Sequence, residues 1–305
     1  ECGVVCFAPP AQMLAQARPD GVIVANPNML PVSTALLCLA AGVPVLLEKP
    51  IGVDLDEVRE LVAASKACGV PVLVGHHRRH NPLIVHAHQL IHSGELGRLT
   101  TVTALWQLQK PEQYFDIPWR REAGAGMLLT NLIHDLDLLR HLCGEVRQVQ
   151  AITSHAVRGY ANEDCAAVLL QFDSGALGTL TGSDAVAAPW SWELTSGENP
   201  VYPRQADQPC YLLAGTGGAL SIPQLKRWHY AQDGAGWHEP LQVEPHTFSP
   251  DEALRLQLQH FVQVIRREVE PLVSAADAAR TLALIEAIRE AAATGRACAP
   301  AQIEG

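Results

Sequence analysis

The chain has 305 residues, a length typical of two domains or of one large domain with additions. Hydrophobic residues make up 48% and charged residues 18% of the sequence, which excludes a chain that is disordered throughout. The formal net charge is −10, whereas binding to nucleic acid or to an anionic membrane requires a basic surface. We therefore expect a folded protein whose partners include neither nucleic acid nor a membrane.

The cysteines and the hydropathy indicate where the protein works. The eight cysteines are dispersed and form no C-x-x-C pair, so the sequence predicts neither a zinc ribbon nor a disulfide framework and favours a reducing compartment. No stretch reaches the ~18 to 20 uninterrupted apolar residues of a membrane span. The opening ECGVVCFAPP also lacks the basic start of a secretory signal. We expect a cytoplasmic protein.

Residues 18 to 75 alternate short apolar runs with helical segments. The expected strands are 22–25, 43–47 and 70–74, and the expected helices are 31–41 and 54–68. Asp54 and Gly69 are typical of the residues that cap a helix at its start and its end. Because each crossover must return across a face of the sheet, this alternation predicts a parallel sheet.

The pattern changes after Gly75, and we place a first domain at 1–75 and a second at 76–305. The second begins with a helix at 82–93, and its runs of two-residue period predict strands at 98–108, 146–157, 163–172, 175–184, 190–196, 209–214, 218–222 and 225–231. A long helix is expected at 127–142 and a helical pair at 251–268 and 274–293. The whole is an α/β protein with a parallel first domain and an α+β second domain with a large, mostly antiparallel open sheet.

Lys49 is the most informative single position. It follows the second expected strand in the tripeptide Glu48-Lys49-Pro50, and open α/β sheets bind their ligands at the carboxyl ends of their strands. The lysine is then poised over a cleft; a solvated loop lysine paired with Glu48 is the alternative. Pro50 adds weight, since an X-Pro bond can be cis and fix the backbone near a ligand.

His134 interrupts the apolar helix at 127–142, one turn from Thr130 and Asn131. A histidine in this setting is either a hydrogen-bonded structural residue or a member of a site. Trp119 and Arg120 place an aromatic ring beside a cation just ahead of the glycine loop that leads into this helix. We treat both interpretations of His134 as open at this point.

Two other groups of residues resemble known binding motifs but lack the residues that would complete them. Gly124-Ala125-Gly126 and Gly215-Thr216-Gly217 both lack the third glycine of a dinucleotide-binding loop. His76, His77 and His80 lie close in sequence, but no nearby cysteine or carboxylate completes a ligand set. We therefore expect no metal.

Taken together, the chain resembles the Gfo/Idh/MocA family, named for glucose-fructose oxidoreductase and inositol dehydrogenase. The resemblance runs over almost the whole chain, through PDGVIVANPN (19–28), AAGVPVLLEKPIG (40–52), GHHRRHNP (75–82), GELGRL (94–99), PWRREAGAGMLLTNLIHDLDLLRHLCGE (118–145) and EDCAAVLLQFDSGALGTL (163–180). Its strongest signature joins EKP at a strand end to HDLDLLR after a glycine loop.

The resemblance implies a Rossmann-like domain that binds NAD or NADP, and an oxidoreductase that moves a hydride between nicotinamide and a secondary hydroxyl or ketone of a sugar, polyol or cyclic diol. It implies cofactor contacts at Asn26, Pro27, Asn28, Glu48, Lys49, His77 and Arg120. It implies substrate contacts at Lys49, Trp119, Asn131 and His134, with Lys49 and His134 as the catalytic pair. The family's open sheet often mediates oligomerisation, so we expect a homo-oligomer that binds a small-molecule substrate.

Two departures from the family keep alternatives open. Members commonly carry an aspartate four residues before the catalytic histidine, where this chain has Thr130; the base is then His134 or Lys49. The glycine fingerprint and its first βαβ unit are expected before residue 1, which predicts an incomplete Rossmann domain, weak NAD(H) binding and an unpaired strand edge at 22–24. The alternatives are a non-catalytic ligand-binding or regulatory relative, and a NAD-dependent lyase or glycosidase.

Overall fold

The computed structural model describes residues 3–26, 31–232 and 234–304. The chain forms two compact units. Unit 1 comprises Glu1–His77, Leu254–Ala283 and Gln302–Gly305, and unit 2 comprises Arg78–Ala253 and Leu284–Ala301. The domain boundary expected between residues 75 and 76 stays a prediction. Within the described ranges, no helix combines the length and the apolar character that a membrane span requires.

Unit 1 is built on a parallel three-stranded sheet of order β1-β2-β3. Its elements are α1 (Pro10–Ala17), β1 (Val22–Val24), α2 (Pro31–Ala40), β2 (Val45–Leu47), α3 (Leu55–Cys68) and β3 (Val72–Val74), followed late in the chain by most of α8 (Ala253–Ile265) and the start of α9 (Ala275–Thr294). Asp54 caps α3 by accepting from the backbone of Asp56 and Glu57, and Gly69 ends it at φ +66°. The expected parallel sheet is confirmed.

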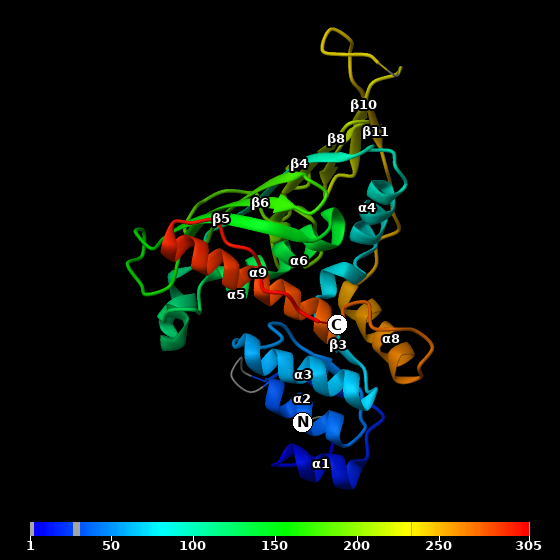
Figure 1. Cartoon of the computed structure of the whole chain (residues 1–305), viewed down its shortest axis with the longest axis vertical. Coiled ribbons are helices and arrows are strands. Elements are labelled where there is room, and N and C mark those ends of the chain that lie inside the picture. The colour runs from blue at the N-terminus through cyan, green and yellow to red at the C-terminus, as the bar shows by residue number, and fades with distance from the viewer. Residues whose placement is uncertain (1–2, 27–30, 233, 305) are drawn as a thin grey trace. The chain divides into compact units, whose positions relative to one another are not determined.

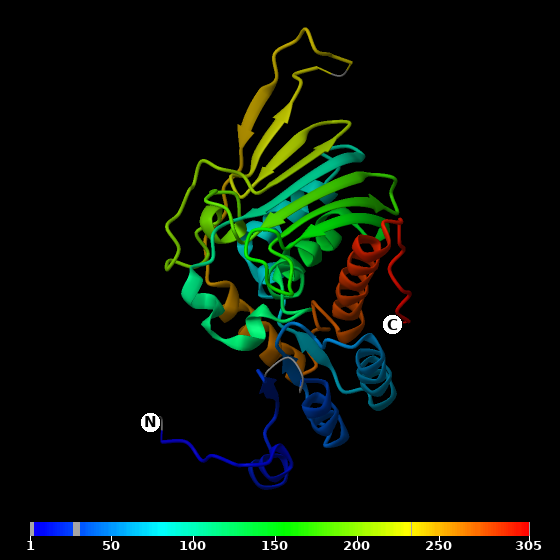
Figure 2. The ribbon, with the colours of Figure 1, turned by 90° about the vertical axis from the view of Figure 1, so that its left-hand side faces the viewer.

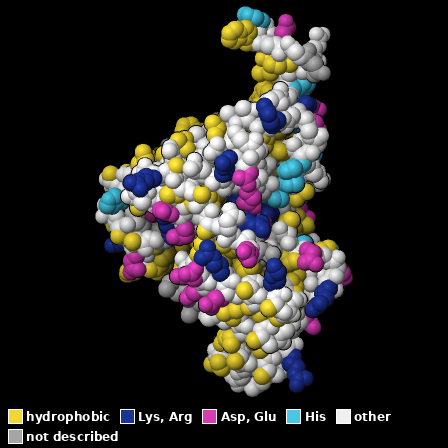
Figure 3. All heavy atoms as spheres, viewed as in Figure 1, with side chains coloured by type: hydrophobic (Ala, Val, Ile, Leu, Met, Phe, Trp, Pro, Cys, Tyr) yellow, Lys and Arg dark blue, Asp and Glu magenta, His cyan; other side chains and the backbone are white. Residues whose placement is uncertain are grey.

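The two edges of this small sheet differ. Beyond β3, the Val74 N–H donates to the Val273 carbonyl at 2.9 Å. At the other edge, β1 pairs with β2 alone within the described ranges, and Ile23 is 54% exposed. Helix α1, which the sequence pattern did not reveal, buries none of its residues, and hydrophobic side chains are exposed over this part of unit 1 (Figure 3). The strand edge expected at residues 22 to 24 is therefore present.

Unit 2 is built on an eight-stranded sheet of order β11-β10-β9-β8-β4-β7-β6-β5 (Figure 1). Its strands are β4 (Leu99–Gln107), β5 (Val146–Ser154), β6 (Cys165–Phe172), β7 (Leu177–Ser183), β8 (Tyr211–Gly215), β9 (Ala219–Ile222), β10 (Lys226–His229) and β11 (Gln242–Pro245). Its helices are α4 (Pro82–His92), α5 (Met127–Thr130), α6 (Leu132–Cys143) and α7 (Trp192–Thr195), with short 3-10 turns η1 (His77–His80), η2 (Glu112–Asp116) and η3 (Pro118–Arg121). All pairs are antiparallel except β4 with β7, which confirms the expected sheet.

The two faces of this sheet have opposite character. Alternate residues such as Val168, Leu180 and Trp106 are buried on the inner face, where α6 comes so close that a Cβ on Gly182 would lie 2.9 Å from Leu132. The outer face carries exposed apolar side chains, because residues alternate between faces along a strand. Figure 2 shows the strands side by side, with the β10–β11 hairpin extending beyond the others.

Two sequence predictions for unit 2 were wrong, and one strand was not predicted. The strand expected at 190–196 is the short helix α7, whose start Ser191 caps by accepting from the Leu194 N–H at 3.3 Å. The helix expected at 127–142 is broken at Asn131 (φ −123°, ψ −58°) into α5 and α6. Just before the break, the Thr130 hydroxyl donates to the Gly126 carbonyl at 2.9 Å, a bond of the kind that bends helices. Strand β11 was missed.

Helix α6 is held by ion pairs to the turn η1. The Arg79 guanidinium donates two hydrogen bonds to the Asp137 carboxylate, at 2.9 and 2.7 Å. Both side chains are at least 95% buried. The run of arginines and histidines at 76–80 is therefore no basic surface patch. It supplies the cations that the buried carboxylates of α6 require, because an unpaired buried charge is very costly.

A second buried cluster lies beside the first. Arg78 contacts Asp135 at 3.4 Å and Glu193 at 2.8 Å, Tyr211 donates its hydroxyl to Asp135, and Trp106 donates to Glu193 at 3.0 Å. Burial raises the pKa of Asp135 to about 7, although the neighbouring Arg78 acts in the opposite direction. Asp135 directly follows His134, so this cluster fixes the turn of α6 that carries the histidine.

We expect Arg79→Met to lower the free energy of unfolding by about 3 to 5 kcal/mol, because it leaves the buried Asp137 carboxylate without its cation. Urea unfolding measures the loss. The control is Arg59→Met, which breaks the exposed Arg59–Asp56 pair and should cost less than ~1 kcal/mol. Equal losses in the two variants would show that burial of the Arg79–Asp137 pair is unimportant.

Asp135 predicts a specific dependence of stability on pH. Between its ordinary pKa near 4 and about 7, the folded chain keeps a proton that the unfolded chain has released, so its contribution to stability falls as pH rises through this window. Asp135→Asn removes that proton. Its unfolding free energy, measured from pH 4 to pH 7, should therefore fall less steeply than that of the parent; parallel curves would contradict the raised pKa.

Candidate functional site

The carboxyl ends of the three parallel strands of unit 1 lie at one edge. The register pairs Val24 with Leu47 and Leu47 with Val74, so the residues that follow each strand come together. The Glu48 N–H donates to the Val24 carbonyl at 2.9 Å, and the Gly75 N–H donates to the Leu47 carbonyl at 2.7 Å. This is the edge at which open α/β sheets bind their ligands.

Glu48 and Gly75 are packed against each other at this edge. A Cβ on Gly75 would lie 2.9 Å from the Glu48 carboxylate and 3.2 Å from its Cα. A side chain at position 75 would therefore push the β2 end away from the β3 end, and glycine permits the close approach. The Glu48 carboxylate also lies 3.3 Å from the Lys49 N–H.

The remaining candidates of unit 1 surround this contact. Lys49 is half-buried and precedes a buried, cis Pro50, and His77 is half-buried after β3. Asn26, exposed after β1, donates to the Thr34 hydroxyl at 2.8 Å. Two predicted cofactor contacts, Pro27 and Asn28, lie outside the described residues. The structure thus brings the Lys49 region and the end of β3 to one edge.

In unit 2, the carboxylate of Glu163 packs against the glycine loop that precedes α5. The Leu128 N–H donates to Glu163 at 2.9 Å, and a Cβ on Gly126 would overlap the Glu163 carboxylate. Gly126 is thus needed to admit Glu163. The contact explains why a glycine stands here although the loop lacks the pattern of a phosphate-binding loop. The Glu163 side chain, and not a phosphate, accepts from the Leu128 N–H.

His134 stands in the first turn of α6 and is 8% exposed. The backbone N–H of His134 donates to the Asn131 carbonyl at 3.0 Å, and the Asn131 side-chain amide lies 2.9 Å from the Thr130 hydroxyl. Asn131 and His134 are therefore held on one turn by the α5–α6 break. The predicted substrate contacts of this segment lie within one short stretch of unit 2.

Trp119 and Arg120 lie in η3, where the guanidinium is fixed by its neighbours. Arg120 donates to the Tyr114 carbonyl at 2.9 Å and lies over the Tyr114 ring at 4.1 Å and the Trp119 ring at 5.5 Å. The Arg120 carbonyl in turn accepts from Asn162 at 2.9 Å. Trp119 itself is 44% exposed and free to contact a ligand.

Sequence reasoning missed a buried lysine near η2. Lys110 lies 3.3 Å from Asp184 and 4.6 Å from the Tyr114 ring, and Asp184 also accepts from Arg158 at 2.8 Å. Burial lowers the pKa of Lys110 and raises that of Asp184. No spacing motif marks these residues, since they come from three separate segments and meet only through the fold.

The predicted site residues are divided between the two units. Unit 1 holds Asn26, Glu48, Lys49 and His77, and unit 2 holds Trp119, Arg120, Asn131 and His134. The first group can supply a cation and a carboxylate at a strand edge. The second supplies an imidazole, an amide and an aromatic ring.

Among curated proteins, the chain is similar to several sugar and inositol enzymes at low identity. It is 28% identical over 300 residues to D-apiose dehydrogenase of Paraburkholderia graminis, covering 94% of this chain and 74% of the relative. It is 24% identical over 278 residues to scyllo-inositol 2-dehydrogenase (NAD(+)) of Bacillus subtilis, covering 88% and 74%. It is 29% identical over 187 residues to 2,7-anhydro-N-acetylneuraminate hydratase of Escherichia coli, covering 58% and 49%.

Solved structures share the fold. An oxidoreductase from Agrobacterium radiobacter, in complex with NAD+, L-tartaric acid and magnesium, superposes with a TM-score of 0.77 at 21% identity, covering 95% of this chain and 82% of that one. The WlbA dehydrogenase of Bordetella pertussis, in complex with NADH and UDP-GlcNAcA, gives 0.73 at 24% identity, covering 96% and 83%.

Two family descriptions match the chain, and together they span more than two thirds of it. Residues 1–76 match the oxidoreductase family with an NAD-binding Rossmann fold. Residues 84–221 match the GFO/IDH/MocA C-terminal domain. The order of the two matches is the order of the parallel and the mostly antiparallel sheet, and so the chain belongs to the Gfo/Idh/MocA family of oxidoreductases.

Proposed function

We propose that this protein is an NAD(P)-dependent dehydrogenase that oxidises a secondary hydroxyl of a sugar, polyol or cyclic diol, or reduces the matching ketone. The observation that carries the proposal is the strand edge of unit 1, where Lys49 follows β2 beside the Glu48–Gly75 contact. A lysine fixed there presents a cation at the place where such sheets bind ligands. Membership of an oxidoreductase family supplies the reaction class.

The donor set at this edge fits the nicotinamide end of a dinucleotide. Glu48 offers a carboxylate to ribose hydroxyls, Lys49 a cation, and Gly75 a backbone without a side chain in the way. His77 stands after the neighbouring strand, and Arg120 is the candidate contributed by unit 2. We propose that these residues, with Asn26, Pro27 and Asn28, hold NAD or NADP. When bound, the nicotinamide supplies the hydride acceptor or donor.

Lys49 and His134 have the chemistry that the substrate requires. A secondary alcohol loses hydride only as its hydroxyl proton leaves, so a base must reach that proton and a cation must steady the developing alkoxide. We assign the proton transfer to His134 and the electrostatic role to Lys49. Thr130 and Asn131 carry no group that titrates near neutral pH, and neither can replace the imidazole.

The substrate class follows from the polar groups of unit 2. Asn131 offers both a donor and an acceptor, and Trp119 a largely exposed ring face. Hydroxyl groups on a ring need paired donors and acceptors, and the apolar face of a sugar stacks on aromatic side chains. The apiose and inositol dehydrogenases named above support the same class.

The proposal is tested by a panel of pentoses, hexoses, inositols and cyclic diols, each assayed with NAD+ and with NADP+ for formation of the reduced cofactor at 340 nm. The cofactor should be present at millimolar concentration, because this sequence contains no G-x-G-x-x-G turn. We expect turnover with at least one polyhydroxylated ring. No turnover with any member of the panel would overturn the proposal.

A second candidate function is an NAD-dependent elimination or hydration, favoured by the similarity to a hydratase. The same groups would abstract a proton and stabilise an anion in such a reaction. The two functions differ in their cofactor balance. A dehydrogenase accumulates reduced cofactor in proportion to product, whereas a hydratase or lyase forms product without net reduction.

We also propose that two copies of the chain pair through the open face of the large sheet. The register places Ile152, Leu169, Leu177 and Leu212 on this one face, and Ile152 is 76% and Leu169 55% exposed. So much apolar surface is unusual on a monomer. A second copy of the same face would bury it.

Lys49→Met should lower kcat by at least ~100-fold, because it removes the cation that steadies the alkoxide. The fold should survive, since the residue lies in a loop at the sheet edge. Steady-state kinetics on the best substrate measure the change, and Lys66→Met, an exposed lysine on α3, serves as the control. Full activity of Lys49→Met would refute the assigned role.

His134→Asn should abolish the acidic limb of the pH–rate profile for alcohol oxidation, because imidazole is the side chain that ordinarily titrates in the neutral range. The profile of kcat/KM from pH 5 to pH 9 provides the measurement. His155→Asn, at an exposed histidine of unit 2, should retain the parent profile. An unchanged profile in His134→Asn would assign the base to Lys49 or to water.

Ile152→Glu combined with Leu169→Glu should convert the oligomer into monomers, since it buries like charges between the paired sheets. Light scattering at micromolar protein gives the mass directly. Leu254→Glu, an exposed leucine on α8, should leave the mass unchanged. A parent protein that is monomeric at this concentration would rule out the proposed pairing.

A further inference from the structure

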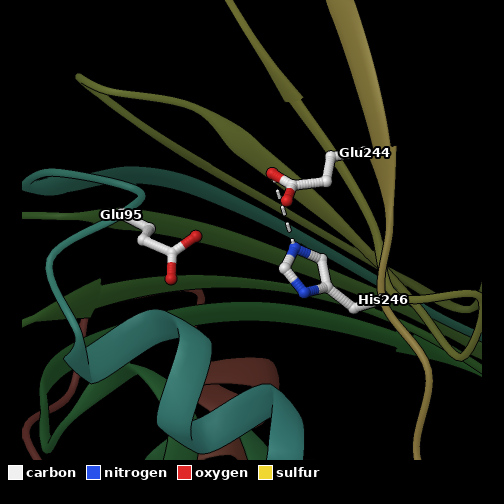
Figure 4. Close-up of side chains that lie close together, drawn as sticks. All are labelled: Glu95, Glu244 and His246. Carbon is white, nitrogen blue, oxygen red and sulfur yellow. Dashed lines mark ion pairs between the residues drawn. The ribbon is translucent and has the colours of Figure 1, made fainter.

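A cluster of carboxylates and imidazoles lies at the far edge of the large sheet, on residues that the proposed reaction does not use. Glu244 is on the edge strand β11, and His246 follows that strand. Glu95 comes from the loop between α4 and β4. Figure 4 shows the side chains of Glu95, Glu244 and His246 turned toward one another. Two segments distant in sequence, the α4–β4 loop and the end of β11, therefore contribute to one place in unit 2.

The facing atoms are close enough to share one ion. A ligand atom from each of the three side chains lies within 4.8 Å of the other two, and the Glu244 carboxylate is 3.8 Å from His246 Nε2. Bonds of ~2.0 to 2.2 Å in the tetrahedral arrangement that zinc prefers place two ligand atoms ~3.3 to 3.6 Å apart. A small rotation of the partly exposed Glu95 and Glu244 side chains covers the difference.

The charge of the cluster also favours a cation. Arg227 lies opposite Glu244 in the β10–β11 register and contacts Glu244 at 3.0 Å and Glu95 at 3.4 Å. One guanidinium offsets one of the two carboxylates, so one negative charge remains while the histidine is neutral. Arg227 contacts one oxygen of each carboxylate; the second oxygen of Glu95 accepts from the Ser93 hydroxyl at 3.3 Å and retains a lone pair for a metal.

Two shielded imidazole nitrogens indicate that this cluster binds a ligand. His246 Nε2 and His86 Nε2 are shielded from solvent and have no hydrogen-bond partner within the described part of the chain. The two rings lie 5.8 Å apart, so both nitrogens belong to the same neighbourhood. A buried imidazole nitrogen without a partner is costly, and coordination to a metal removes that cost.

We propose that Glu95, Glu244 and His246 bind one divalent transition-metal ion, of which Zn²⁺ is the best match. An imidazole with two carboxylates suits zinc better than calcium or magnesium, which prefer oxygen ligands alone. Water completes the coordination. The ion ties the edge strand β11 to the α4–β4 loop, and it competes with Arg227 for the two carboxylates.

Spacing rules could not find this site. His246 is separated from Glu95 by roughly half the chain, and the two acidic residues lie in unrelated sequence contexts. The earlier expectation of no metal was based on His76, His77 and His80, which belong to a different part of the fold.

The test uses the full chain, freed of metal with EDTA and titrated with ZnCl₂ by calorimetry. We expect a site whose affinity falls at least ~10-fold in Glu244→Gln and in His246→Ala. Glu239→Gln and His238→Ala, exposed residues of the same hairpin, are the matched controls and should bind like the parent. Arg227→Met should bind more tightly, because it removes the competing cation.

Hydrogen exchange separates this site from zinc bound elsewhere by cysteines or histidines. In the parent, Zn²⁺ should slow exchange of the β10–β11 amides, and this protection should vanish in His246→Ala while circular dichroism confirms its fold. Equal zinc affinity in the parent, Glu244→Gln and His246→Ala would overturn the proposal. So would zinc binding that leaves exchange in β10–β11 unchanged.

Discussion

Unit 2 depends on four buried ionisable groups: Arg78 and Arg79 of η1, with Asp135 and Asp137 of α6. None of them can be buried alone, because desolvation of a single charge costs several kcal/mol. Each pair therefore requires η1 and α6 to meet in one register. Such pairs fix geometry more than they add stability. Here the fixed geometry is that of the helix turn that carries His134.

In unit 1 a glycine, and not a set of ion pairs, fixes the geometry of the candidate site. Gly75 lets the ends of β2 and β3 approach closely enough for Glu48 to pack against the backbone, and Lys49 is positioned as the next residue. The proposed chemistry thus uses two side chains that are each placed by backbone contacts or by buried charges. A catalytic group held in this way loses little entropy when the substrate binds.

Much of the fold could be predicted from the sequence. Short apolar strands alternating with helices indicated the parallel sheet, and two-residue alternation indicated the larger one. The prediction failed where local patterns were ambiguous. Residues 190–196 alternate like a strand, but Ser191 caps a helix there. The backbone at Asn131 leaves helical geometry within what looked like one helix. The buried ion pairs of Arg78 and Arg79 could not be predicted, since their carboxylate partners lie more than fifty residues away. The site residues were suggested by family resemblance, and their roles stay predictions.

The central claim is that hydride passes directly between the substrate carbon and the nicotinamide while His134 handles the proton. The most direct test is turnover of a substrate that carries deuterium on its carbinol carbon, followed by NMR of the reduced cofactor. The account predicts that the deuterium appears at C4 of the nicotinamide, on one face only. Deuterium released into water, or product formed with no label in the cofactor, would contradict it.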